Sequence, residues 1–308
     1  MPDGAPGRAR WVLHGLSLAA TLCTTTFFGA WHYAGFEAHA GPLAVLPDPS
    51  TLAFWLQGLW YSVPVLAILG VHEAGHYAAC RAYGVAATPP IFLPAPLPLT
   101  GTLGAFIRIR DVIPHRRALF DIGASGPLAG FAVAVPVLIL GLALSRPGAP
   151  PADLDVIVLG HPVIQQAIAW ALWGPLPDGF ALHLHPVARA AWFGLLATAL
   201  NLFPLAQLDG GHVAYAVFGA RARWISLGTA AVVVGLTLVS TSWVAWALLM
   251  AIVLAASGPL HPPTADDGPP LDRGRLALAL VAAVVFLLSF TPRPVDVEIA
   301  APPGLAAR

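Results

Sequence analysis

Apolar residues in this chain are concentrated in runs of about 20 residues, separated by short polar or proline-rich segments. A run of that length matches an α-helix that crosses the hydrocarbon core of a bilayer. Such runs cover residues 11–34, 52–82, 119–144, 187–205, 224–239, 243–256 and 276–290. The pattern predicts an all-α polytopic membrane protein, a bundle of about six or seven transmembrane helices. The number depends on whether residues 224–256 cross the membrane once or twice.

Residues 84–116 break this pattern. They hold five prolines between positions 89 and 98, which forbid a long helix. Residues 105–110 then alternate apolar and polar side chains, as a β-strand does. We therefore expect a short membrane-associated hairpin or extended segment here. The longest polar connection, residues 146–186, is expected to contain an interfacial helix near residues 163–173.

The composition agrees with a membrane protein and excludes other classes. Hydrophobic residues make up 57% of the chain and charged residues only 10%, whereas a soluble domain has about 25% charged residues. So few charges cannot cover the surface of a soluble domain. The formal net charge is zero, which gives no bulk attraction for nucleic acid, and no nucleic-acid partner is expected. Cys23 and Cys80 are interpreted as apolar packing residues.

The distribution of arginine predicts the orientation in the membrane. The segment before the first apolar run and every second connection between the runs are rich in arginine. Their arginines are Arg8, Arg10, Arg81, Arg108, Arg110, Arg116, Arg117, Arg221, Arg223, Arg273 and Arg275. The intervening segments, residues 35–50 and 146–186, carry more acidic than basic residues. We expect a multi-pass protein of the cell membrane with a cytoplasmic N-terminus.

The second apolar run contains His72-Glu73-Ala74-Gly75-His76. Residues four apart lie on one face of a helix, so both imidazoles can reach one Zn²⁺. The Glu after the first His is placed to act as a general base on a zinc-activated water. Ionisable residues inside a membrane span are costly, which favours a functional role. Since this run enters from outside, the motif and the active site are expected toward the cytoplasmic leaflet.

A catalytic zinc site needs a third protein ligand and one open position. Asp209 is a candidate because it stands where the fourth apolar run ends, at the same predicted cytoplasmic level as the histidines. The two glycines after it permit sharp backbone geometry. Spacing alone leaves two readings open: a metal ligand, or an Asp in an ordinary helix-end turn. Glu37 and Glu298 lie outside the predicted spans, which disfavours a glutamate as the third ligand.

Three motifs together resemble the site-2 protease family of intramembrane zinc metalloproteases. They are the His72 to His76 motif, Gly126-Pro127-Leu128-Ala129-Gly130, and Asn201-Leu202-Phe203-Pro204 leading to Leu208-Asp209-Gly210-Gly211-His212. The resemblance covers about residues 52–215 of the chain. Many members of that family carry an inserted PDZ domain, and this chain has no room for one. It therefore looks like the PDZ-less branch.

The resemblance implies a set of roles for the motif residues. His72, His76 and Asp209 would hold zinc, one ion per chain, and Glu73 would be the catalytic base. Asn201, near the end of its span, would donate a hydrogen bond to an oxyanion; the alternative is a hydrogen bond between helices. The partner implied is a single-span membrane protein substrate in the lipid bilayer. The sequence leaves open whether an upstream protease must make a first cut, and it does not predict the oligomeric state.

The sequence thus predicts an intramembrane zinc metalloprotease that acts in regulated intramembrane proteolysis. Two alternatives from other classes are a membrane metal-ion transporter and a non-catalytic regulator that binds helices. The first would show internal repeats, and the second would usually lack a ligand or the glutamate. We expect three parts: a first transmembrane helix and outer loop at 1–50, a catalytic core at 51–219, and C-terminal transmembrane helices with a tail at 220–308. Asp121 is read as a helix-start acid or a partner of a ligand histidine.

Overall fold

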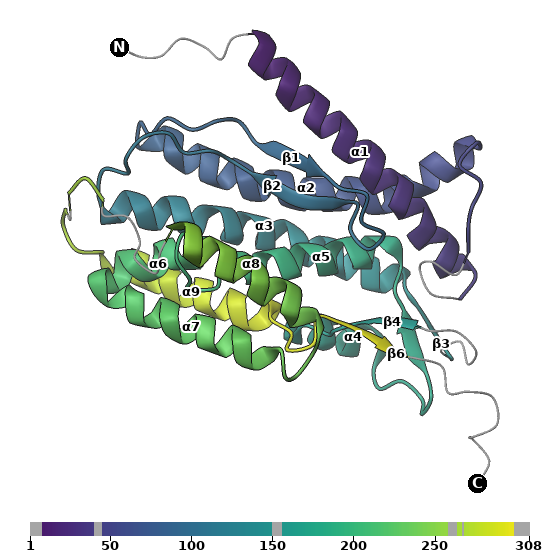
Figure 1. The fold of residues 1–308 in the computed structure, drawn as a ribbon. Coiled ribbons are helices and arrows are strands. Elements are labelled where there is room, and N and C mark those ends of the chain that lie inside the picture. Colours follow the sequence, from purple (N-terminus) through teal and green to yellow (C-terminus); the bar gives the residue numbers. More distant parts are fainter. Residues whose placement is uncertain (1–7, 40–44, 150–155, 258–263, 267, 299–308) are drawn as a thin grey trace.

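Helices make up most of the computed structural model, which describes residues 8–39, 45–149, 156–257, 264–266 and 268–298 (Figure 1). The helices are α1 Arg8–Glu37, α2 Leu52–Ala82, α3 Arg116–Leu144, α4 Val163–Trp173, α5 Pro186–Asn201, α6 Asp209–Phe218, α7 Ala222–Leu236, α8 Ser242–Ser257 and α9 Arg273–Ser289. A short 3-10 helix, Gly219–Arg221, joins α6 to α7. The predicted helical class is confirmed, and α4 lies where an interfacial helix was expected.

Four helical stretches within the described residues are long and apolar enough to cross a membrane. They are Trp11–Glu37, Leu52–Ala82, Arg116–Leu144, and Asp209–Leu236, in which α6 and α7 are taken together. Large apolar side chains such as Leu140, Leu248 and Leu280 are exposed on the bundle, as expected for a surface that faces lipid. The protein is therefore a multi-pass membrane protein. The count of six or seven spans stays a prediction, because α5, α8 and α9 are shorter.

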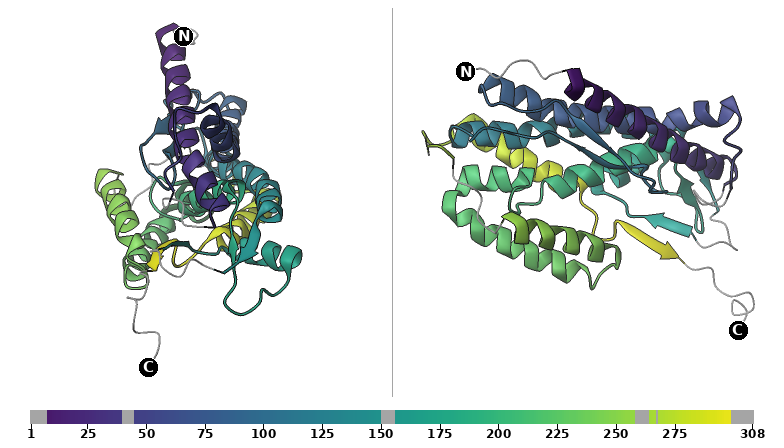
Figure 2. Two further views of the ribbon diagram at one scale, coloured as in Figure 1. Left: turned by 90° about the vertical axis from the view of Figure 1, so that its right-hand side faces the viewer. Right: turned by 45° about the horizontal axis from the view of Figure 1, so that its top comes forward.

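The proline-rich segment forms the expected hairpin. Strand β1, Ile91–Pro94, pairs antiparallel with β2, Thr102–Phe106, with Ile91 opposite Phe106. The hairpin lies between α1 and α2, and the N-terminal half of α1 projects beyond the rest of the bundle (Figures 1 and 2). Strand β2 begins three residues before the alternating pattern at residues 105–110. At its start the Thr102 hydroxyl donates to the Leu93 carbonyl at 2.7 Å and closes the turn. Beyond Phe106 only the bridge between Ala87 and Ile109 continues the pairing.

Two further strand pairs were not predicted. Strand β3, Arg146–Gly148, pairs with β5, Ala181–His183. Strand β4, Val156–Leu159, pairs with β6, Val295–Glu298, which lies far away in the sequence. Each strand is three or four residues long, which is too short for a periodic pattern to be recognised.

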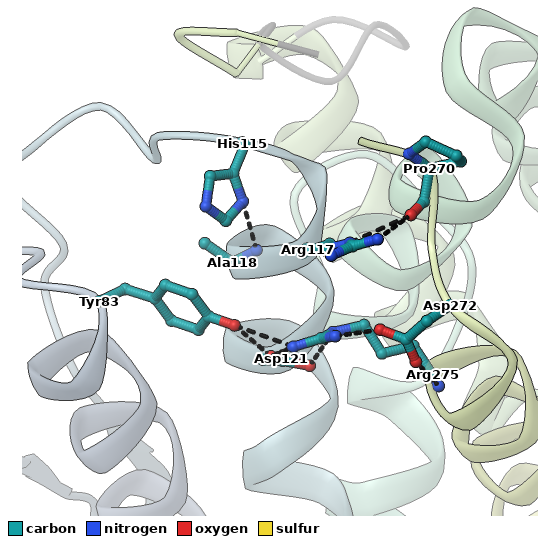
Figure 3. Close-up of polar contacts among 8 residues, drawn as sticks. All are labelled: Tyr83, His115, Arg117, Ala118, Asp121, Pro270, Asp272 and Arg275. Atoms are coloured by element: carbon teal, nitrogen blue, oxygen red, sulfur yellow. Dashed lines mark hydrogen bonds and ion pairs between the residues drawn. The ribbon is translucent and has the colours of Figure 1, made fainter. Parts of the chain in front are cut away.

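A polar cluster joins α9 to the ends of α2 and α3 (Figure 3). The Arg275 guanidinium of α9 binds both carboxylate oxygens of Asp121 in α3, at 3.0 and 2.6 Å. The hydroxyl of Tyr83, the C-cap of α2, donates to the same carboxylate at 2.5 Å and accepts from Arg275 at 3.1 Å. Asp272 caps α9 by accepting from the Arg275 backbone N–H and also pairs with its guanidinium. Arg117 adds two hydrogen bonds to the Pro270 carbonyl.

This cluster excludes the reading of Asp121 as the partner of a ligand histidine. Its carboxylate is held by an arginine and a tyrosine, so it is an ion-pair partner between helices and not the partner of a ligand histidine. The side chains of Arg275 and Asp121 are 24% and 26% exposed. A bidentate pair of this kind is stronger than a fully exposed one.

We predict that Arg275→Gln lowers the free energy of unfolding by about 1–2 kcal/mol, because Asp121 loses its bidentate cation while staying partly buried. The melting temperature in detergent, followed by tryptophan fluorescence, measures the change. Arg81→Gln, an exposed arginine in the last turn of α2, is the control and should leave the melting temperature unchanged. Equal melting temperatures for Arg275→Gln and wild type would contradict a stabilising role of the ion pair between Arg275 and Asp121. The double variant Asp121→Asn/Arg275→Gln should lose less free energy of unfolding than the sum of the losses in the two single variants.

Candidate metal centre

Helix α2 presents the motif as the spacing predicts. His72 and His76 lie one turn apart on one face, with their ring centroids 4.9 Å apart. His72, Glu73 and His76 are all buried, at 4%, 6% and 7% exposure. Such burial removes the imidazoles from bulk water, so their nitrogen atoms must find partners within the protein.

Asp209 brings the third side chain to this face. It is the first residue of α6, and its Oδ2 lies 3.3 Å from His72 Nε2 and 3.2 Å from His76 Nε2. The two Nε2 atoms are 3.1 Å apart. The turn between α5 and α6 directs Asp209 inward because Gly210 packs against the backbone of Leu202. A Cβ at position 210 would lie 2.1 Å from the Leu202 carbonyl oxygen, so only glycine fits there.

The donor set fits zinc. Two imidazole nitrogens and one carboxylate oxygen, all within 4.8 Å of one another, are ligand types that Zn²⁺ takes in catalytic sites. The Nδ1 of His76 lies 2.7 Å from the Ile122 carbonyl, which can only accept, so Nδ1 carries the proton. The lone pair of Nε2 then points at the cluster, as in metal sites whose ligand histidine is held by a backbone carbonyl. Three acceptor atoms this close repel one another unless a cation or a proton lies between them.

Helix α3 approaches the motif through glycine. A Cβ at Gly126 would lie 2.1 Å from His76 Nε2, and one at Gly75 would lie 2.6 Å from the Ser125 carbonyl oxygen. Neither position has room for a side chain. These small residues let the two helices approach closely. Because Gly126 has no side chain, α2 can lie close enough for the Ile122 carbonyl to reach His76.

Two further groups contact the cluster. Asn201, the last residue of α5, places its side-chain amide nitrogen 3.3 Å from His72 Nε2. The backbone N–H of Ile107, just after β2, lies near the Glu73 carboxylate. The structure therefore gathers all five predicted site residues, while their roles as ligands, base and oxyanion donor stay predictions. Sequence reasoning missed the backbone groups of Ile122 and Ile107, because no residue type marks a backbone donor or acceptor.

Comparison with known proteins gives the family. The model of peptidase family M50 matches residues 60–242, more than half of the chain. A protein named probable zinc metalloprotease EGY2, chloroplastic, from Oryza sativa subsp. indica is 31% identical over 245 residues, which cover 77% of this chain and 43% of that protein. The protein of the same name from Arabidopsis thaliana is 29% identical over 243 residues, covering 77% of this chain and 42% of that protein.

A third relative, named probable zinc metalloprotease EGY1, chloroplastic, from Oryza sativa subsp. japonica, is 33% identical over 190 residues, with 59% of this chain and 32% of that protein covered. The chain spans less than half the length of these relatives. No solved structure matches the chain. The matched region contains α3, α5 and most of α2, with all five predicted site residues. The chain belongs to peptidase family M50, the site-2 protease family.

Proposed function

We propose that this protein is an intramembrane zinc metalloprotease that hydrolyses a peptide bond within the transmembrane segment of a membrane-anchored protein. The observation that carries the proposal is the convergence of His72, His76 and Asp209 beside Glu73, in a buried cluster of a chain from peptidase family M50. A single-span protein is the proposed substrate, and the need for a prior cut by an upstream protease is left open.

Each residue of the cluster has a proposed role. His72, His76 and Asp209 would hold one zinc ion per chain and leave a fourth position open. Zinc in such a site supplies a Lewis acid that polarises the scissile carbonyl. Glu73 would take the proton of the attacking water and pass it to the leaving amine, and the Ile107 N–H lies near its carboxylate. The amide of Asn201 would donate to the oxygen that becomes negative in the transition state.

The geometry of the membrane part supports a cytoplasmic position for the site. The arginine-bearing ends of α2, α3 and α9 meet at the cluster of Tyr83, Asp121 and Arg275, and the positive-inside rule assigns this end to the cytoplasm. We accordingly propose a cytoplasmic N-terminus, a site in the cytoplasmic half of the bilayer, and a catalytic core at 51–219 between the two flanking parts. The relatives are named chloroplastic, and location in the cell membrane stays a prediction for this chain.

We predict that the purified protein holds about one zinc ion per chain, as a site with three protein ligands should. His72→Ala, His76→Ala and Asp209→Ala should each lose most of the zinc, because two remaining ligands bind far more weakly. Inductively coupled plasma mass spectrometry of the detergent-purified variants measures the content. His183→Ala, in β5, is the matched control and should keep the metal. Full zinc in Asp209→Ala would show that the third-ligand assignment is wrong.

We predict that Glu73→Gln keeps zinc and the fold but loses at least about a hundredfold in cleavage rate, because the amide cannot accept a proton. The assay uses proteoliposomes with a tagged single-span substrate, and mass spectrometry of the products locates the cut. Wild type should cut in the cytoplasmic half of the transmembrane segment. Glu37→Gln, whose carboxylate pairs with Arg146 at 3.4 Å, is the control and should stay active. Unchanged cleavage by Glu73→Gln would show that Glu73 is not the base, no cleavage by the wild type would favour the transporter alternative, and a cut in the outer half would contradict the topology.

A further inference from the structure

An open pocket of about 550 Å³ lies between the N-terminal part of α1 and the extended segments that flank the hairpin. Its lining includes Leu13, His14, Ile91, Arg108, Ile109 and Arg110. The walls therefore combine aliphatic side chains with two guanidinium groups and an imidazole. None of these residues belongs to the metal cluster. The N-terminal part of α1, which carries Leu13 and His14, projects from the bundle (Figure 2).

The two arginines are held on a braced backbone. The Arg108 N–H donates to the Thr88 hydroxyl at 2.9 Å, and the Thr88 N–H donates to the Arg108 carbonyl at 3.0 Å. The Arg110 N–H donates to the Ala86 carbonyl at 2.8 Å. In an extended chain, residues two apart point to the same side, so both guanidinium groups project together from a backbone that is already ordered. A ligand that binds there does not have to order this segment.

The positive charge of the pocket is not neutralised by the protein. Both arginines are exposed, and neither forms an ion pair with a carboxylate of the residues that the structure describes. Asp111, next in the chain, instead accepts the Ala86 N–H at 2.8 Å. His14 donates its Nδ1–H to the Pro90 carbonyl at 3.1 Å, which leaves Nε2 for a further contact. The pocket thus offers two free cations to an anion.

The surroundings of the pocket are those of the membrane surface. Trp11, Leu13 and Leu16 of α1 are 54%, 59% and 64% exposed. Leu13 lines the pocket, and Leu16, its neighbour one turn further along the helix, extends this wall as an apolar ridge. A tryptophan near the end of a membrane helix commonly anchors at the lipid headgroups. Basic pockets between transmembrane elements bind anionic headgroups, and the acyl chains lie along the neighbouring apolar surface. A soluble anion would use the arginines but not the ridge.

We propose that this pocket binds the phosphate headgroup of an anionic membrane phospholipid, with Arg108 and Arg110 as its main contacts. The site does not depend on proteolysis, and its test needs no substrate. Arg108 directly follows Ile107, whose N–H lies near the Glu73 carboxylate. A bound lipid would therefore brace the segment next to the proposed catalytic base.

The test is native mass spectrometry of the full chain after delipidation in detergent, titrated with dioleoyl phosphatidylglycerol or with dioleoyl phosphatidylcholine. These probes share acyl chains and differ in net charge. Wild type should bind phosphatidylglycerol roughly tenfold more tightly, and Arg108→Gln/Arg110→Gln should reduce the preference to less than about twofold. Arg108→Lys/Arg110→Lys should keep most of it, because the charges remain.

The matched control is Arg221→Gln/Arg223→Gln, which removes two exposed arginines at the same spacing on the same predicted side of the membrane. It should keep the preference for phosphatidylglycerol. Melting temperatures identify any variant that does not fold, in which case Arg108→Gln and Arg110→Gln are measured singly, each with a partial loss expected. Equal affinity of wild type for the two lipids, or a glutamine variant that binds like the control, would overturn the proposal. So would complete displacement of the lipid by millimolar inorganic phosphate at constant ionic strength.

Discussion

The close approach of α2 and α3 is the constraint on which the rest of the site depends. At Gly126 the two helices leave no space for even one carbon atom, since a Cβ there would lie 2.1 Å from His76 Nε2. Because the backbones are so near, the Ile122 carbonyl reaches His76 Nδ1 at 2.7 Å and fixes the orientation of the ring. One residue earlier, Asp121 reaches Tyr83 and Arg275. A single turn of α3 thus holds His76 on one side and α9 on the other.

Burial explains why so many polar contacts gather at this place. An imidazole or carboxylate in an apolar bundle is destabilising unless it has a partner. Here the partners are other members of the cluster and the Ile122 carbonyl, and the Ile107 N–H lies near the Glu73 carboxylate. A backbone partner cannot rotate away as a side chain does, so the Ile122 carbonyl holds the His76 ring in a fixed position. The apolar surroundings keep bulk water away, which strengthens electrostatic interactions with a bound cation.

The sequence predicted the local features of this site better than its long-range ones. The helical spacing of His72 and His76 depends on one stretch of chain, and both lie on α2 as expected. The position of Asp209 near the histidines could be predicted because a glycine pair marked a sharp turn at the end of an apolar run. The contact of Arg275 with Asp121 could not be predicted, since it joins residues 154 apart in the sequence. The ligand roles and the division into three parts remain predictions.

X-ray absorption spectroscopy at the zinc K-edge, on the detergent-purified protein, tests the central claim most directly, that α2 and α6 together form one zinc site. The account predicts a first shell of nitrogen and oxygen only, at about 2.0–2.2 Å. Multiple scattering should correspond to two imidazoles, and His76→Ala, which loses most of the zinc, should give only a small fraction of the zinc signal. A sulfur shell near about 2.3 Å, or a spectrum that His76→Ala leaves unchanged, would contradict the account.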